Sequence, residues 1–98
     1  MAKKVVWTKR TSRKFDAIIE YLEEDWNENV VRAFVLRTET VLELLSRNPE
    51  LGTVENSERG IYGFRLTKHN RLFYRFNDQR LIVLNLFDNR QNPKRKRY

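Results

Sequence analysis

The segment from Gly60 to Arg90 constrains the fold more than any other part of the chain, because it contains three short apolar runs separated by two polar turns. In residues 62–67 and again in residues 71–76, apolar or aromatic side chains occupy every even position. Successive side chains of a strand point to opposite faces, so each run predicts a strand with one apolar face. The turns at 68–70 and 77–80 suit hairpins, and the segment therefore predicts a three-stranded antiparallel meander.

The other face of the predicted meander is basic. Arg65 lies at an odd position of the first run, and Arg71 and Arg75 lie at odd positions of the second. The third run, 81–87, is apolar at odd and even positions alike except for Asn85, which is typical of a strand covered on both faces. We expect the three arginines to gather on the exposed face of the sheet; strand arginines that merely discourage edge aggregation are the alternative.

The first half of the chain predicts one strand and two helices. Residues 5–7 form a brief apolar run that suits a further strand. Residues 15, 18, 19 and 22 have helical spacing, which predicts a helix over about residues 10–24, capped by Thr8, Thr11 or Ser12. A second helix is expected after a cap at Asp25 or Asn27 and runs to about residue 47, where it stops before Pro49.

These elements predict an α+β fold. We expect an N-terminal strand and an antiparallel two-helix hairpin packed on one face of an antiparallel sheet that ends in the meander. Residues 51–60 are expected to form a polar loop. Residues 1–90 are predicted to be a single domain and 91–98 a basic, flexible tail, since 98 residues suffice for one core.

The net charge of +7 is concentrated in the second half of the chain. Residues 1–49 hold nine Lys/Arg against eight Asp/Glu, whereas residues 50–98 hold eleven against five. Nucleic acid or an acidic protein would complement this charge, and a soluble basic surface without a ligand is the alternative. The first helix also begins with four cations that oppose its macrodipole: Lys9, Arg10, Arg13 and Lys14. This placement indicates either contact with a polyanion or a solvent face whose charges are screened by salt.

The composition excludes several classes of protein. The chain has no cysteine, which rules out disulfide frameworks and thiolate metal sites. No apolar run approaches the length of a membrane span, and the N-terminal run is too short for a signal peptide. We expect a cytoplasmic protein that has no membrane partner and needs no cofactor.

The order of these motifs resembles the RelE/ParE family of bacterial toxins over essentially the whole chain. The resemblance rests on Val6-Trp7-Thr8, Asn48-Pro49 followed by Gly52, and residues 62–66, 71–75 and 87–93. It implies a toxin of a type II toxin–antitoxin module that a cognate antitoxin neutralises. Metal-independent, ribosome-dependent cleavage of mRNA is the main functional expectation. Inhibition of DNA gyrase is the alternative, as is an inactive member that binds only antitoxin or nucleic acid.

The resemblance also nominates catalytic residues. Arg65 lies where related nucleases carry a strand lysine, Arg71 matches the arginine that opens the next strand, and Arg90 matches the arginine that ends the last. We expect these three guanidinium groups to hold the scissile phosphate at one accessible spot on the face away from the helices. His69 is the only histidine and is a candidate for proton transfer, but no general base is assigned. A second strand lysine of the family is replaced by Gly63, and the tyrosine expected beyond the last arginine is missing.

Further residues are candidates for binding the substrate. Arg75 shares the basic face of its strand, and the rings of Phe73 and Phe87 could stack on bases. Aromatic residues on a sheet also serve as core or as a partner interface, and the sequence leaves these readings open. The predicted tail adds four consecutive cations: Lys94, Arg95, Lys96 and Arg97.

Overall fold

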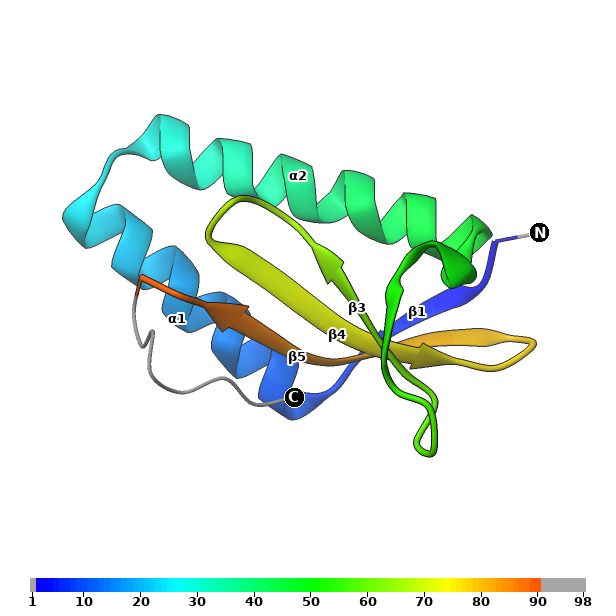
Figure 1. Cartoon of the computed structure of the whole chain (residues 1–98). Coiled ribbons are helices and arrows are strands. Elements are labelled where there is room, and N and C mark those ends of the chain that lie inside the picture. Colours follow the sequence, from blue (N-terminus) through cyan, green and yellow to red (C-terminus); the bar gives the residue numbers. More distant parts are fainter. Residues whose placement is uncertain (1, 91–98) are drawn as a thin grey trace.

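The computed structural model describes residues 2–90 and confirms the α+β fold. Two helices lie on one side of a twisted sheet (Figure 1). The first strand precedes the helices in the chain, and the other strands follow them. The elements in chain order are β1 (Lys4–Trp7), α1 (Lys9–Asp25), α2 (Glu28–Arg47), the 3-10 helix η1 (Pro49–Leu51), β2 (Thr53–Asn56), β3 (Ile61–Arg65), β4 (Asn70–Phe76) and β5 (Arg80–Asp88).

The sheet has the strand order β1-β5-β4-β3-β2. Strands β3, β4 and β5 form the predicted antiparallel meander. Strand β1 joins the sheet beside β5, but it runs parallel to β5, with Val5 opposite Leu81. The sheet is therefore mixed rather than wholly antiparallel. The segment 51–60, expected to be a loop, contains η1 and β2, which pairs with β3 through Thr53 and Gly63.

Hydrogen bonds from side chains fix where the two helices begin. The Thr8 hydroxyl accepts a hydrogen bond from the backbone N–H of Thr11 at 3.2 Å and lies 3.1 Å from the Val83 carbonyl oxygen, to which it can donate, so α1 starts against β5. Asn27 Oδ1 accepts from the backbone N–H of Val30 at 3.1 Å and caps α2. The second helix ends at Arg47, ahead of Pro49, as predicted.

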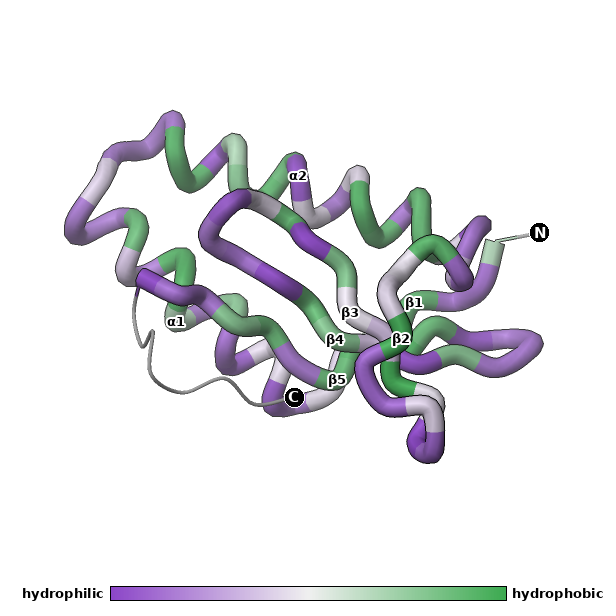
Figure 2. Tube along the Cα trace, viewed as in Figure 1, coloured by the Kyte–Doolittle hydropathy of each residue, from purple (hydrophilic) through white to green (hydrophobic). Residues whose placement is uncertain are grey.

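The core lies between the helix hairpin and the apolar face of the meander. Even-numbered residues of β3 and β4 point to this side, as the alternation predicts. Figure 2 shows apolar positions recurring along both helices between hydrophilic ones, which is the pattern of a helix packed on one face. Fully buried members of the core come from all of these elements: Ile18, Leu22, Val41, Leu45, Leu72, Tyr74, Leu81 and Val83.

Strand β5 is buried on its helix side and only partly covered on the other face, where the sequence predicted two covered faces. Leu81, Val83 and Leu86 are buried on the helix side, whereas Leu84 and Phe87 are only half-buried. Asn85 and its partner Phe73 on β4, both on the arginine face, are 4% and 0% exposed. Within residues 2–90, no helix has an apolar stretch of the length required to span a membrane.

Candidate functional site

Arg65 and Arg71 lie next to each other on the face of the sheet away from the helices. Arg65 is directly opposite Arg71 across β3 and β4, and Arg71 is opposite Phe87 across β4 and β5. Residues in such positions have Cβ atoms about 4.5–5.5 Å apart, and like charges there repel each other. The sheet thus brings two guanidinium groups together at a cost that a nearby anion would offset.

One such anion belongs to the protein itself. The Oε2 atom of Glu55, on β2, lies 2.6 Å from Arg71 Nη2, and the two side chains are only 20% and 29% exposed. Gly63 makes room for this ion pair, because a Cβ atom there would lie 2.9 Å from both Arg71 Nε and Glu55 Oε2. Sequence reasoning missed Glu55 because it placed this residue in a loop. The two β-branched residues that precede it, in Thr53-Val54, were the available signal for a strand.

A hollow of about 270 Å³ opens beside this ion pair, and we call it the Arg71 hollow. His69 reaches it from the β3–β4 turn, where its Nδ1 atom lies 3.3 Å from Asn89 Oδ1. With the proton on Nδ1, the imidazole donates to Asn89 and leaves Nε2 as an acceptor. The lining residues are Arg65, Lys68, His69, Arg71, Phe87 and Asn89, with Thr67 and Asn70 beneath.

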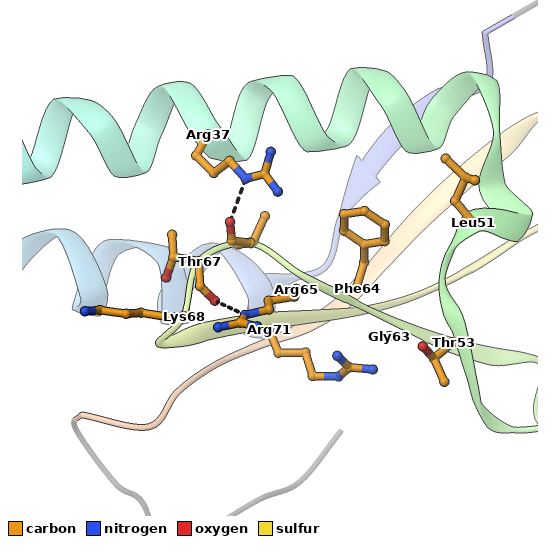
Figure 3. Close-up of a pocket in the computed structure, with 10 residues that line it drawn as sticks. Arg37, Leu51, Thr53, Gly63, Phe64, Arg65, Thr67, Lys68 and Arg71 are labelled. Atoms are coloured by element: carbon orange, nitrogen blue, oxygen red, sulfur yellow. Dashed lines mark hydrogen bonds between the residues drawn. The ribbon is translucent and has the colours of Figure 1, made fainter.

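A second hollow, of about 500 Å³, is lined by the same two arginines and by Arg37 of α2 (Figure 3). Arg37 reaches it from α2 and donates through Nε to the Leu66 carbonyl oxygen at 2.6 Å. Arg65 donates through Nε to the Thr67 carbonyl oxygen at 3.2 Å, which orients its guanidinium. Arg65 and Arg71 therefore line both hollows, and all charged lining residues within residues 2–90 are cationic.

Arg90 does not join the other two arginines, and the prediction of three guanidinium groups at one spot is wrong for this residue. Its Nη2 and Nε atoms lie 2.9 and 3.2 Å from the Asp88 carboxylate. The guanidinium carbon is also 5.6 Å from the ring centroid of Tyr21 and 5.7 Å from that of Trp26, both on or just after α1. Asp88 alternates with Phe87 along β5, so the pair points to the helix side of the sheet.

The Asp88 carboxylate is buried and tightly held. Asn70 Nδ2 donates to it at 2.8 Å, in addition to the bonds from Arg90. Burial raises the pKa of Asp88, but the hydrogen bonds from Arg90 and Asn70 outweigh that effect and hold the pKa below the usual value. The charge of Arg90 is therefore neutralised within the protein, and its side chain links the end of β5 to Tyr21 and Trp26 at the end of α1.

The remaining candidates for substrate binding are dispersed. Phe73 faces the arginine side but is fully buried under Arg71, whose guanidinium carbon lies 6.0 Å from its ring centroid, so it offers no surface to a base. Phe87 lines the Arg71 hollow and is half-buried. Arg75 lines a different hollow, described below. Lys94, Arg95, Lys96 and Arg97 lie outside the described residues.

The chemistry available at the Arg71 hollow is that of phosphate binding and proton transfer. Two guanidinium groups can hold a phosphate oxygen, and an imidazole can donate or accept a proton. The Glu55 carboxylate, which contacts Arg71 from outside the lining, can accept a proton. Residues 2–90 contain no group of three or more His, Asp or Glu side chains arranged to hold a metal ion.

The fold is that of small bacterial toxins whose structures have been solved. The chain superposes on a chain of the chromosomal ParDE toxin–antitoxin system from P. aeruginosa with a TM-score of 0.72 and 12% identity, covering 89% of this chain and 96% of that one. The YoeB/ParE toxin from Agrobacterium tumefaciens gives a TM-score of 0.62 at 21% identity, covering 87% and 96%. A chain of the RelBE2 toxin–antitoxin complex from Mycobacterium tuberculosis gives 0.60 at 21%, covering 90% and 99%.

The sequence narrows this class to one family. Residues 5–93 match the family described as the ParE toxin of the type II toxin–antitoxin system parDE. The chain therefore belongs to the ParE toxin family of type II toxin–antitoxin systems. No curated protein sequence matches it significantly.

Proposed function

We propose that this toxin arrests growth by cleaving mRNA on the ribosome and that a cognate antitoxin neutralises it. One observation carries the proposal: Arg65, His69 and Arg71 line a single hollow, and the Glu55 carboxylate, which is not part of the lining, contacts Arg71 at 2.6 Å. This set supplies positive charge, a base and an acid within one region of the arginine face. It differs from the set predicted from the sequence, because Glu55 enters it and Arg90 leaves it.

The proposed reaction is attack of a ribose 2′-oxygen on the adjacent phosphorus. Glu55 takes the 2′-hydroxyl proton as the new P–O bond forms, and the bond from phosphorus to the 5′-oxygen breaks. Protonated His69 gives its proton to the leaving 5′-oxygen, so the products are a 2′,3′-cyclic phosphate and a 5′-hydroxyl. Arg65 and Arg71 stabilise the additional negative charge on the phosphate oxygens in the transition state.

Arg71→Ala tests the proposal most directly. Induction of the toxin without antitoxin should arrest growth and give new 5′ ends in primer extension on ribosome-bound messages. Arg71→Ala should abolish both effects while the protein still folds and copurifies with its antitoxin. Arg80→Ala is the matched control, because Arg80 is exposed and lies outside both hollows. Cuts that persist in Arg71→Ala would refute the assignment of this site.

Inhibition of DNA gyrase without chemistry is the second candidate. It is favoured by the two ion pairs, since Glu55 already neutralises Arg71 and Asp88 holds Arg90 away from the hollow. In that case the purified protein should inhibit supercoiling by gyrase, and ribosome-bound messages should show no new cuts. Absence of growth arrest on induction would instead indicate an inactive family member that binds only antitoxin or nucleic acid.

The proposed antitoxin partner rests on the relatives. The matched structures from P. aeruginosa and Mycobacterium tuberculosis are named as a toxin–antitoxin system and a toxin–antitoxin complex. A small acidic protein encoded beside this chain would be the natural candidate, given the net charge of +7. Coexpression of that neighbour should relieve growth arrest and yield a stable complex on size exclusion.

A further inference from the structure

A third hollow, of about 550 Å³, lies between the first turn of α1 and strands β3 to β5, apart from the Arg71 hollow. Its lining includes three arginines from three different segments, and we call it the Arg75 hollow. Arg75 is four residues beyond Arg71 on β4, or about 13 Å along a strand. Its lining residues include Arg10, Glu58, Arg59, Ile61, Arg75 and Leu84.

The positive charge of this hollow is largely unbalanced. In the described part of the chain, Arg10, Arg59 and Arg75 form no ion pair, whereas Arg32, Arg47, Arg71 and Arg90 each contact a carboxylate. All three of these arginines are exposed, and Glu58 is the only acidic residue among the described residues that line the hollow. A concave surface with three cations and one anion concentrates positive potential and attracts anions.

The backbone beneath the three arginines is fixed. Arg10 follows Thr8, whose hydroxyl anchors α1 to β5, and Thr11 Oγ1 donates to the Val83 carbonyl oxygen at 2.7 Å. The N–H of Arg59 donates to Asn56 Oδ1 at 3.0 Å, which holds the β2–β3 turn, while Arg75 is set by its pairing with β5. The hollow is therefore a preformed feature, and only the guanidinium ends have to adjust to a ligand.

The floor of the hollow is apolar. Ile61 is only 5% exposed, and Leu84 is half-buried beside it. An apolar floor excludes water from one side and strengthens the attraction between the arginines and a bound anion. Guanidinium groups recognise phosphate through paired N–H donors, and three of them at one place exceed what a single phosphate needs.

We propose that the Arg75 hollow binds successive backbone phosphates of a nucleic-acid strand. The arrangement of the sheet supports this ligand, because Arg75 shares its face with Arg65, which forms no ion pair among the described residues, so cations recur along the sheet in a way suited to a linear polyanion. It also gives a role to Arg10 in the first turn of α1, whose charge opposes the helix dipole and which does not line the Arg71 hollow. The inference does not depend on cleavage, since it concerns binding alone.

Fluorescence anisotropy with a labelled single-stranded RNA and the purified full chain tests the proposal. The double variant Arg59→Gln/Arg75→Gln should bind about tenfold more weakly, and its log–log salt slope should fall by about 0.7 for each lost phosphate contact. Arg32→Gln/Arg47→Gln is the control, because it removes the same charge from the outer side of α2. Equal loss in the two variants, or no loss in the first, overturns the proposal.

Two further measurements separate this ligand from others. Glu58→Gln removes the acidic residue of the described lining and should tighten RNA binding. Glu39→Gln, the same change on α2, is the control and should tighten binding less. Equal affinities of the two variants would count against the site. Inorganic pyrophosphate and polyglutamate serve as competitors at matched charge. Full displacement of the RNA by pyrophosphate would assign the hollow to a small anion, and full displacement by polyglutamate would assign it to an acidic protein, so either result overturns the proposal.

Discussion

The guanidinium of Arg90 lies 2.9 Å from the buried carboxylate of Asp88, on the side of the sheet that faces α1. The contact fastens the end of β5 to the aromatic rings at the end of α1. An arginine that the family resemblance nominates for catalysis thus has a structural partner in this chain. We therefore expect replacement of Arg90 to lower the free energy of unfolding, whatever its effect on catalysis.

Loss of the Arg90 side chain should destabilise the protein. Arg90→Ala leaves the Asp88 carboxylate buried with Asn70 as its remaining side-chain partner, and breaking a buried pair in this way costs about 3 kcal/mol. Arg80→Ala, which removes an exposed arginine, should stay within about 0.5 kcal/mol. Urea unfolding followed by circular dichroism measures both. An Arg90→Ala variant as stable as Arg80→Ala would show that the pair contributes little.

The same pair predicts the acid sensitivity of the fold. The folded-state pKa of Asp88 lies below its unfolded value of about 3.9, so its contribution to stability is present above that pH and is lost as the pH falls through the folded pKa. Asp88→Asn, which cannot titrate, should show a smaller decline in the free energy of unfolding below about pH 4. Identical pH profiles for the two proteins would contradict this role.

Glu55→Gln distinguishes a catalytic base from a simple counter-ion of Arg71. The amide keeps the size of the side chain and a hydrogen bond to Arg71 but cannot take a proton. If Glu55 is the base, mRNA cleavage should fall about 10²- to 10⁴-fold although the site becomes more positive. A counter-ion role predicts unchanged or stronger RNA binding and cleavage. Primer extension with ribosome-bound message, beside an anisotropy measurement, separates the two outcomes.

Replacement of His69 tests its role as the proton donor. His69→Gln cannot give a proton to the leaving 5′-oxygen, so mRNA cleavage should fall about 10²- to 10⁴-fold while RNA binding is retained. Asn89→Ala, which removes the contact to Nδ1, should reduce the cleavage rate less than His69→Gln does. Cleavage at the wild-type rate in His69→Gln would remove this residue from the mechanism.

Tyr74 predicts sensitivity to alkali. Its hydroxyl donates to the Pro49 carbonyl oxygen at 2.6 Å and accepts from the Gly52 N–H at 3.0 Å, and burial raises its pKa to about 12. The neutral phenol stabilises the fold, and this contribution should be lost between about pH 10, where the unfolded chain ionises, and pH 12. Tyr74→Phe should lose about 1–3 kcal/mol at neutral pH and show a flatter alkaline decline in thermal unfolding.

The sequence predicted the features that depend on strong local patterns. The alternation in β3 and β4 placed Arg65 and Arg71 on one face, and Thr8, Asn27 and Pro49 marked the ends of the helices. These signals are carried by neighbouring residues and need no knowledge of distant partners.

The features that were missed depend on tertiary contacts. Strand β2 has four residues and no buried side chain, so its sequence resembles a loop, and Glu55 was overlooked with it. Arg90 lies beyond the end of β5, where alternation no longer predicts its direction, and its position depends on Tyr21 and Trp26, about 65 residues earlier in the chain. The meander of β3, β4 and β5 could be inferred from local patterns, whereas no local pattern specifies the parallel direction of β1.

That parallel pairing has a consequence for biosynthesis. Val5 finds its partner only at Leu81, so the N-terminal strand has no neighbour in the sheet until most of the chain has been made. A ribosome translating this message therefore carries an incomplete fold through nearly all of elongation, and contacts of such long sequence separation form late. The sheet is therefore completed only when its last strand has been made.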